Sequence, residues 1–405
     1  MKSGRVFLLF LLLVISPLTS CQRGEIPPLS RENLFVLSIG RLEDQVDLFG
    51  IEQRGQMGKI RIAMQDGIVW IVDGNGGKVQ RFTSYGDLIS MVYNPETNPP
   101  PLTLKTEFDE GDVVTRKAFA WPLEAPGELS IDSQKELFVE ERLPENRRQQ
   151  DPSTLQQLDR VVLHFDRDGQ FVDFLGQEGP GGTPFPCMEG LHHSVDDELV
   201  VVCRTIKGYT VYWFDRHGNP LFVVLLDRED VPVPDDSSLP PSLEAVYPAP
   251  DERVLYLKVN YYKQIIDETT DSVFGIDLSE AKLWAMKVED GTYVDSMTIP
   301  DYEFRESTGG AGDDAVHRGI YDLLGVANDG QVFMYAPQAG GYVLLILEKG
   351  SHARRHGFIH VRDDELYYST FRLSPEGIIS ALLAAEYEVR LVWWRASGLF
   401  GESLP

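Results

Sequence analysis

The chain has 405 residues, of which 42% are hydrophobic and 10% aromatic, so it can bury a large core. Its formal net charge at pH 7 is −26. Because so acidic a surface repels phosphate backbones and anionic lipid headgroups, we expect no nucleic-acid partner.

The first 20 residues have the order of an export signal. Lys2 and Arg5 precede an apolar run over 6–15, which is shorter than the roughly 20 residues of a membrane-spanning helix. The run ends in Leu-Thr-Ser before Cys21, which resembles a bacterial lipobox. We therefore predict a signal peptide over 1–20, lipid attached to Cys21 and a short polar tether over 21–31. The protein would be exported and anchored to a membrane, on the periplasmic side or at the cell surface.

Residues 59–92 set the pattern for most of the chain. Four short runs rich in Ile, Val, Phe and Tyr, over 59–64, 68–73, 78–83 and 87–92, are separated by turns containing Gly, Asp or Asn. This order is typical of an antiparallel four-stranded meander. One such sheet is too small to be stable alone, so we expect others beside it.

The turns of this unit recur along the chain. The turn before the second strand, at 66–70, has counterparts at 132–138, 196–200, 251–255, 329–333 and 363–367. The turn between the third and fourth strands, at 84–86, has counterparts at 165–169 and 214–218, with a weaker one at 373–377. Six copies of a four-stranded unit predict an all-β fold, a six-bladed β-propeller formed by a single domain over 32–405.

The two ends of the domain are expected to meet. A strand candidate at 34–39 precedes the first full blade, and we expect it to complete the last blade and close the ring. Only 34 residues separate Val332 from Leu366, too few for four strands, so one of the last two blades is expected to be truncated or to share a strand.

Five long insertions interrupt the repeats, at 93–128, 142–160, 227–242, 260–271 and 289–319. In a meander, the connection between the second and third strands and the connection to the next blade lie at the same end. All five insertions fall there, so we predict one bare face and one elaborated face that carries the function. Within 93–128 we expect a hairpin of 102–108 with 113–121.

Aromatic residues within these insertions are candidate anchors for a partner. They are equally compatible with small cores under long loops, and both interpretations stay open. The candidates are Phe119, Trp121, Tyr261, Tyr262, Tyr302 and Phe304.

Histidine and aspartate pairs give weaker signals. His352, His356 and His360 would share a face of a helix and could bind zinc there, but the strand-like run after Gly357 favours surface histidines. Neighbouring His192 and His193 alternate across a strand, so both cannot face one ion. The aspartate pairs at 235–236, 313–314 and 363–364 lack the spacing of a calcium loop.

No nucleophile elbow, phosphate-binding loop, dinucleotide fingerprint or Cys-His cluster is present in the sequence. We therefore predict no catalytic residue, no metal ligand and no cofactor. A propeller enzyme can nevertheless assemble a site from single residues on successive blades, which no local motif would show.

Two cysteines follow Cys21. An oxidising compartment favours a disulfide between Cys187 and Cys203. A hairpin centred on 196–197 would place residue 190 opposite Cys203, so a bridge needs a bulge or a slipped register. Two buried thiols are the alternative.

Segments near both ends carry a family resemblance. Residues 38–49, 369–384 and 392–395 together resemble a family of predicted spirochaetal lipoproteins, which has no settled activity and supplies no catalytic residues. Residues 66–73 with 78–82 are similar to an NHL-type propeller repeat, which implies the fold alone.

These observations lead to one functional prediction and one alternative. The prediction is a non-enzymatic binding scaffold or receptor of the cell envelope, with an envelope protein or ligand as partner. The alternative is a propeller hydrolase or lyase with a metal-dependent site at the mouth of the central channel.

Overall fold

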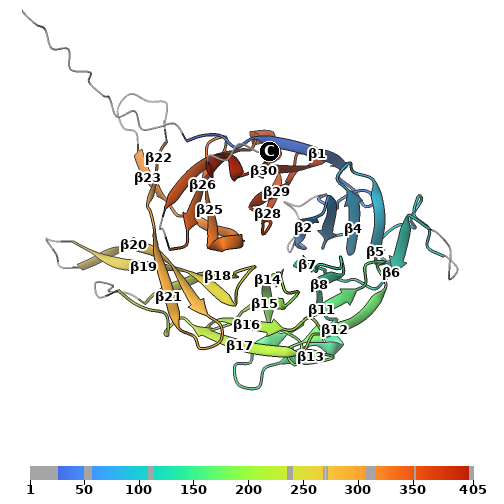
Figure 1. Cartoon of the computed structure of the whole chain (residues 1–405), viewed down its shortest axis with the longest axis horizontal. Helices are drawn as coiled ribbons and strands as arrows, with labels where there is room; N and C mark the ends of the chain where they lie inside the picture. Colours follow the sequence, from blue (N-terminus) through green and yellow to red (C-terminus); the bar gives the residue numbers. More distant parts are fainter. Residues whose placement is uncertain are drawn as a thin grey trace, which may run out of the picture.

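The chain forms a six-bladed β-propeller, as the repeat predicts (Figure 1). The computed structural model describes residues 26–49, 57–107, 114–234, 240–267, 270, 272–306, 315–350 and 353–400. The predicted signal peptide and Cys21 lie outside these ranges. Six sheets surround a central channel, and the first strand of each blade faces it.

Each blade is built on an antiparallel sheet, and in blades 1 to 5 its strands follow the chain from the centre outward. Blade 1 consists of β2 (Ile60–Gln65), β3 (Ile68–Asp73), β4 (Lys78–Thr83), β5 (Leu88–Tyr93) and the added β6 (Lys117–Ala120). Blade 2 consists of β7 (Leu129–Ile131), β8 (Leu137–Arg142), β11 (Arg160–Phe165), β12 (Phe171–Gly176) and β13 (Gly179–Pro180). Blade 3 consists of β14 (Cys187–His193), β15 (Leu199–Arg204), β16 (Gly208–Phe214) and β17 (Pro220–Asp227).

The second half of the ring has three four-stranded blades. Blade 4 consists of β18 (Ser242–Pro248), β19 (Val254–Asp267), β20 (Ser272–Lys287) and β21 (Tyr293–Ile299). Blade 5 consists of β24 (Asp322–Ala327), β25 (Gln331–Gln338), β26 (Gly341–Glu348) and β27 (Arg354–His360). Blade 6 consists of β28 (Tyr368–Leu373), β29 (Ile378–Ala384), β30 (Glu388–Arg395) and the N-terminal β1 (Arg31–Ser38). The connections contain the pairs β9 (Gln149–Gln150) with β10 (Gln157–Leu158) and β22 (Tyr302–Glu306) with β23 (Ala315–Gly319), and the short 3-10 helices η2 (Glu145–Arg147), η3 (Asn328–Gly330), η4 (Asp363–Glu365) and η5 (Ser397–Phe400).

Aspartate marks the repeated turns for a conformational reason. Asp66 and Gly67 both have positive φ, 50° and 72°, as a two-residue type I′ turn requires. Asp197 (φ 59°) and Asp329 (φ 61°) lie in the same connection of blades 3 and 5. Aspartate tolerates this left-handed region because its short side chain can form local hydrogen bonds.

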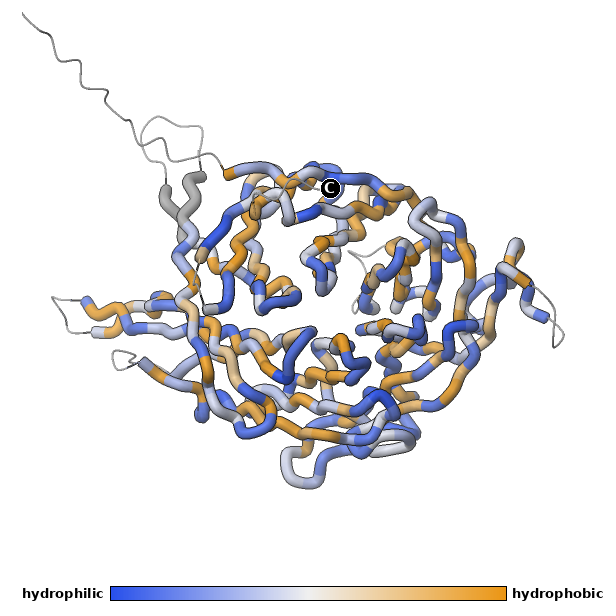
Figure 2. Tube along the Cα trace, viewed as in Figure 1, coloured by the Kyte–Doolittle hydropathy of each residue, from blue (hydrophilic) through white to orange (hydrophobic). Residues whose placement is uncertain are grey.

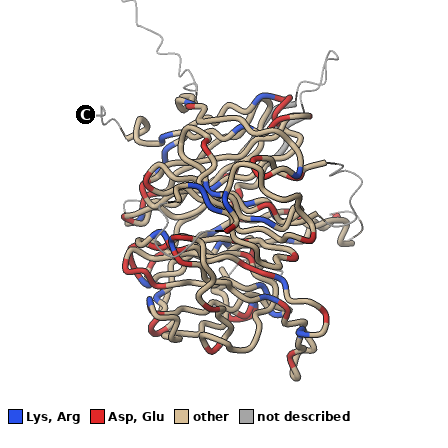
Figure 3. The backbone as a smooth tube through the Cα atoms, turned by 90° about the vertical axis from the view of Figure 1, so that its right-hand side faces the viewer, with Lys and Arg blue, Asp and Glu red and all other residues tan. Residues whose placement is uncertain are grey.

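The core lies between the blades. Six clusters of buried side chains each join two neighbouring blades, and the cluster between blades 2 and 3, for example, includes Phe138, Val162, Leu191 and Phe214. Both faces of each sheet are therefore covered, which explains the apolar stretches within the blades in Figure 2. Acidic and basic residues are interspersed along the chain around the side of the ring in Figure 3.

The N-terminal strand closes the ring, as predicted. Strand β1 pairs antiparallel with β30 as the outer strand of blade 6. Glu365, which is fully buried in η4, accepts hydrogen bonds from Arg31 of β1 at 2.6 and 2.7 Å and from Arg390 of β30 at 2.8 Å. Burial alone would raise the pKa of Glu365, but these two guanidinium groups outweigh it and lower the pKa to about 2.

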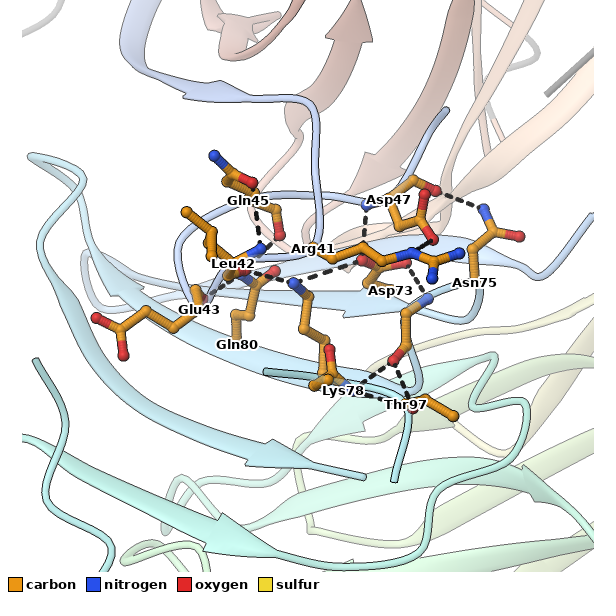
Figure 4. A network of polar contacts seen from close by, with 12 residues as sticks. Arg41, Leu42, Glu43, Gln45, Asp47, Asp73, Asn75, Lys78, Gln80 and Thr97 are labelled. Atoms are coloured by element: carbon orange, nitrogen blue, oxygen red, sulfur yellow. Dashed lines mark hydrogen bonds and ion pairs between the residues drawn. The ribbon is translucent and has the colours of Figure 1, made fainter. Parts of the chain in front are cut away.

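After β1, the loop over 41–47 is fastened to blade 1 by a network that we call the N-terminal clasp (Figure 4). Lys78 and Asp73 are fully buried, with Nζ and Oδ2 separated by 3.9 Å. Lys78 donates a shorter hydrogen bond, 2.7 Å, to the carbonyl of Leu42. Asp73 accepts hydrogen bonds from the backbone N–H groups of Asp47 and Gly76, both at 2.8 Å.

Gln80 adds two more hydrogen bonds to the clasp, whereas the attraction between Lys78 and Asp73 contributes little to it. The Gln80 amide donates to the carbonyls of Glu43 and Gln45 at 2.6 and 3.0 Å. Loss of hydration lowers the pKa of Lys78 and raises that of Asp73, so their mutual attraction only partly compensates for burial. The clasp therefore holds the loop mainly through directed hydrogen bonds.

The boundary between blades 5 and 6 differs from the prediction, because neither blade is truncated. The segment at 363–367 resembles the repeated turn, yet it forms η4 in the connection between the blades, and β27 is the fourth strand of blade 5. The turn at 374–377 joins the first and second strands of blade 6, not the third and fourth. The fourth strand of blade 6 is the N-terminal β1, so the C-terminal residues need to supply only three strands, β28, β29 and β30.

Two of the predicted insertions are also built differently. The predicted insertion at 260–271 does not interrupt blade 4 before Asp267, because β19 continues to that residue and pairs with β20, which begins at Ser272, as one long hairpin. Within 93–128, the described residues form no antiparallel hairpin: β6 pairs in parallel with β5 as a fifth strand of blade 1. Leu104, Ala118 and Leu123 are buried there, so this segment is part of the core.

Candidate binding face

One face of the ring carries the long connections, as predicted. In every blade, the first and second strands are joined by a short turn, whereas the connections between second and third strands and between blades lie at the opposite end. That end carries β6, the β9–β10 and β22–β23 pairs and the extension of the β19–β20 hairpin. We call it the elaborated face.

At the elaborated face the central channel opens into a cavity of about 710 Å³, which we call the mouth cavity. Its lining comes from the inner strands of five blades, through Arg61, Glu189, Tyr247, Asp322 and Arg372. Residues of β15, β16, β25 and β26 complete it. A site assembled from single residues on successive blades is invisible to a motif search, which is why the sequence did not indicate it.

A network of ion pairs fixes one wall of the mouth cavity. Buried Glu140 accepts hydrogen bonds from Lys59 at 2.8 Å and Arg160 at 2.7 Å, and Glu128 accepts one from Arg61 at 2.9 Å. Burial alone would lower the pKa of Lys59, but Glu128 and Glu140 outweigh it and raise it. Every charge in this group has a partner, so the network joins blades 1 and 2 and is not free for a ligand.

A second cavity of about 620 Å³ opens at the bare face. His192 and His193 both line it. Burial lowers the pKa of His192 well below its ordinary value and that of His193 to about 3, so both rings are neutral at physiological pH. His193 is within 2.9 Å of the Ser130 hydroxyl and packs edge-on against Phe138.

The most prominent feature of the elaborated face is an arm, formed by 261–267 of β19 and 272–280 of β20 (Figure 1). Strand β18 pairs with β19 only as far as Asn260, and β21 pairs with β20 only from Ala281. No described strand pairs with either edge of the arm. An isolated two-stranded ribbon is only marginally stable in water.

The arm has one apolar face. The register places Tyr262 opposite Leu278 and Ile266 opposite Val273. Ile276 lies between these pairs on the same side, opposite Gln264, the one polar residue among them. Ile266, Val273 and Ile276 are 51%, 55% and 65% exposed. The other side carries Lys263 opposite Asp277 and Asp267 opposite Ser272. The arm therefore presents an uncovered apolar strip to solvent.

The predicted aromatic anchors do not form one surface. Tyr261 and Tyr302 are buried in the cores beside blade 4, and Trp121 stacks on Phe171 with ring centroids 4.0 Å apart. Phe119 packs in the same core as Trp121. The small-core interpretation therefore describes these four residues.

Two of the six candidates remain. Tyr262 lies half-buried on the apolar face of the arm. The side chain of Phe304 lies outside the described residues. Ile266, Val273, Phe274 and Ile276 are the exposed apolar residues of the arm, and they were not singled out from the sequence. Only the short alternation of Ile276 and Leu278 with Asp277 and Ser279 is a local signal for this ribbon.

The histidine and aspartate pairs are placed as follows. His356 and His360 are exposed on β27, and His352 lies outside the described residues. Asp363 and Asp364 belong to η4, and the other two aspartate pairs also lie outside. In the described part of the chain, no three His, Cys, Asp or Glu side chains are grouped so that they could hold a metal ion.

Both described cysteines are free thiols. A bulge between Met188 and Gly190 shifts the register, so Cys203 lies opposite Met188 and Cys187 lies opposite Arg204. Cys203 is buried and Cys187 is exposed, and burial raises the pKa of both thiols. Neither is activated as a nucleophile.

No helix among the described residues is both long and apolar enough to cross a membrane.

No family model matches the chain, and no curated protein is similar to it. Solved structures match it at low identity. The gluconolactonase XC5397 from Xanthomonas campestris has a TM-score of 0.40 and 13% identity, covering 91% of this chain and 97% of that chain. The polysaccharide lyase Uly1 has a TM-score of 0.46 and 9% identity, covering 90% and 100%.

The periplasmic gluconolactonase PpgL from Pseudomonas aeruginosa has a TM-score of 0.36 and 13% identity, covering 90% of this chain and 99% of that chain. The β-propeller domain of the Trilobed protease from Pyrococcus furiosus has a TM-score of 0.38 and 11% identity, covering 84% and 94%. A β-propeller is compatible with both enzymatic and non-enzymatic roles.

Proposed function

We propose that the protein is a non-enzymatic binding propeller of the cell envelope, which holds a partner protein at its elaborated face. The uncovered apolar strip of the arm carries the proposal. A two-stranded ribbon gains little stability from its own hydrogen bonds, and its exposed Ile and Val side chains favour a covering partner.

The partner is a protein with an apolar surface and a neutral or basic rim. The net charge of −26 opposes close approach of a second copy of this chain and of anionic lipid, whereas it attracts a basic partner. The rigid ring would present the arm in a fixed orientation, which lowers the entropy lost on binding.

The membrane anchor belongs to the same proposal. Lipid on Cys21 would hold the propeller at the membrane and raise its local concentration near other envelope proteins. Leu29 donates a backbone hydrogen bond to Phe358 of β27 at 2.8 Å, so the free tether would end near residue 26. Such a tether reaches about 20 Å at most, which would keep the ring close to the bilayer.

The test uses substitutions that keep the arm folded. Ile266→Thr, Val273→Thr and Ile276→Thr together remove the apolar strip but retain β-branched residues suited to strands. Lys263→Thr with Asp277→Thr is the matched control on the opposite side. A photoreactive residue at position 276 of the full chain identifies the protein in contact with the arm in native membranes, and that protein is then purified.

We expect the purified partner to bind the wild type and the control equally and the triple variant at least about tenfold more weakly. Equal binding by all three would overturn the proposal. A cross-link only to a second copy of the chain would also overturn it, and sedimentation of the purified protein would detect that self-association independently. A photoreactive residue at position 263 is the background control, and cross-linking from position 276 that does not exceed this background would overturn the proposal as well.

A further inference from the structure

The two cavities of the central channel meet at a narrow waist. His192 of β14, Tyr247 of β18 and Arg372 of β28 line both cavities, so they separate the elaborated end of the channel from the bare end. They come from blades 3, 4 and 6 and therefore surround the channel axis. The waist is the floor of the mouth cavity.

Arg372 reaches across the channel. Its Nη2 donates to the carbonyl of Leu191 at 3.2 Å, joining blade 6 to blade 3 on the opposite side of the ring. Among the described residues, no carboxylate forms an ion pair with Arg372. Arg61, in the same cavity, is paired with Glu128 at 2.9 Å. A guanidinium has five N–H donors, so Arg372 has donors left for an anion in the cavity.

The rest of the waist is neutral and shaped around Arg372. His192 is buried and packs edge-on against Tyr247, with ring centroids 4.4 Å apart. Its pKa is lowered by burial first and by the charge of Arg372 second. A side chain on Gly190 would place Cβ 2.5 Å from His192 Nε2, so glycine at that position leaves room for the ring.

One wall of the mouth cavity is aromatic. Tyr335, Tyr342 and Phe371 contact one another, with ring centroids 5.1 to 5.9 Å apart. Phe371 directly precedes Arg372 in the chain. Hydrogen-bonding groups lie around the wall, through Glu189, Glu244, Asp322 and Thr370. Carboxylates and hydroxyls beside an aromatic surface suit a ligand that has both a ring face and hydroxyl groups.

We propose that the mouth cavity binds a sugar acid. The ligand's carboxylate pairs with Arg372 at the floor, its ring lies against Tyr335, Tyr342 and Phe371, and its hydroxyls donate to the carboxylates of the rim. A neutral sugar would leave the guanidinium unpaired, and a small polyvalent anion would leave the aromatic wall empty and face the acidic rim. This site is separate from the arm and does not depend on the partner proposed for it.

The experiment is calorimetric titration of the full chain with three probes, D-glucuronate, D-glucose and inorganic phosphate. We expect glucuronate to bind at least about tenfold more tightly than glucose and phosphate. Arg372→Gln should weaken glucuronate binding by at least about tenfold, and Phe371→Leu should weaken it less. Arg216→Gln, an exposed arginine in the turn between β16 and β17, is the matched control and should bind as the wild type does.

Arg372→Gln loses the hydrogen bond to Leu191, so we expect a slightly lower melting temperature but a protein that is fully folded at the temperature of the titration. A merely structural role for Arg372 would appear as loss of the folded state at that temperature. Titration with a hyaluronan tetrasaccharide distinguishes a site for free glucuronate from a site for glucuronate within a polysaccharide. Binding of glucuronate or of the tetrasaccharide supports the site if Arg372→Gln weakens that binding. The proposal is overturned if neither glucuronate nor the tetrasaccharide binds, if glucose or phosphate binds as tightly, or if Arg372→Gln binds like the wild type.

Discussion

The N-terminal clasp and the waist of the channel both hold a cation away from bulk water, but they treat it differently. In the clasp, Lys78 is fully buried between the Leu42 carbonyl and Asp73. At the waist, Arg372 donates one hydrogen bond to a carbonyl and faces an open cavity. A buried charge with nearby protein partners joins two segments of the chain, whereas a charge that faces a cavity with donors to spare is available to a ligand.

Ring closure by Glu365 is the strongest case of the first kind, and removing its charge should have the largest effect. Glu365→Gln leaves Arg31 without an anion and Arg390 with Glu388 alone, and breaking a buried pair costs about 3–5 kcal/mol. We expect the urea midpoint at pH 7 to fall accordingly. Glu32→Gln is the control, because Glu32 lies beside Arg31 in β1 and is exposed, and it should change stability by less than about 0.5 kcal/mol.

The same residue predicts an acid dependence. The pKa of Glu365 is lowered from 4.5 to about 2 in the folded protein, so its contribution is complete above pH 4.5 and is lost as the pH falls towards 2. Glu365→Gln should lack this component of acid unfolding. If the wild type and Glu365→Gln lost stability equally between pH 4.5 and pH 2, closure of the ring would depend on the pairing of β1 with β30 alone.

Lys78→Met should have a smaller effect. Methionine fills a similar volume, but the Leu42 carbonyl loses its donor and Asp73 loses its cation. We expect a loss of about 2 kcal/mol, because the ion pair is long and Asp73 keeps two backbone N–H donors. Chemical denaturation measures it, with exposed Lys207→Met as the control. A loss as large as that of Glu365→Gln would show that the clasp depends on the charge itself.

Glu141 sharpens the comparison because it is a buried carboxylate without a cation. Its Oε1 accepts backbone hydrogen bonds from Glu124, Ala125 and Arg142, and its Oε2 has no partner. Burial outweighs those hydrogen bonds and raises the pKa from 4.5 to about 7. Ionisation therefore destabilises the fold progressively from pH 4.5 to 7, and the penalty is complete above pH 7.

Glu141→Gln should remove this penalty. The amide oxygen keeps the three backbone donors, while its NH₂ group gains no partner, so we expect a net gain of about 1 kcal/mol at pH 8 and none at pH 4. Melting temperatures across pH 4 to 8 measure the difference. A variant less stable than the wild type at pH 8 would mean that the ionised carboxylate is favourable there.

The repeat pattern predicts the fold well because each blade obeys local rules. Aspartate and glycine turns mark strand ends, and they identify most of blades 1, 2 and 3 directly. The error at blades 5 and 6 arose because Asp-Asp-Glu before Leu366 resembles a repeated turn, whereas Glu365 is buried there and accepts hydrogen bonds from Arg31. Sequence shows the local pattern but not the distant partner.

The candidate sites were less predictable. The sequence predicts a break in blade 4 at 260–271 because the polar residues at 267–272 resemble a loop, whereas β19 continues to Asp267 and β20 begins at Ser272. The waist unites residues from β14, β18 and β28, which lie far apart in the sequence. Only the closed ring brings them together, so the sequence contains no local pattern for them.

Pairing of β1 with β30 has a consequence for the order of assembly. Arg31 pairs opposite Trp394, so the two strands that seal the ring are almost the whole chain apart. Contacts of such long sequence separation form slowly, because a large loop must close first. A chain that emerges from a narrow pore with its N-terminus leading would keep β1 unpaired until residue 395 had passed through, so its final structure could form only on the far side.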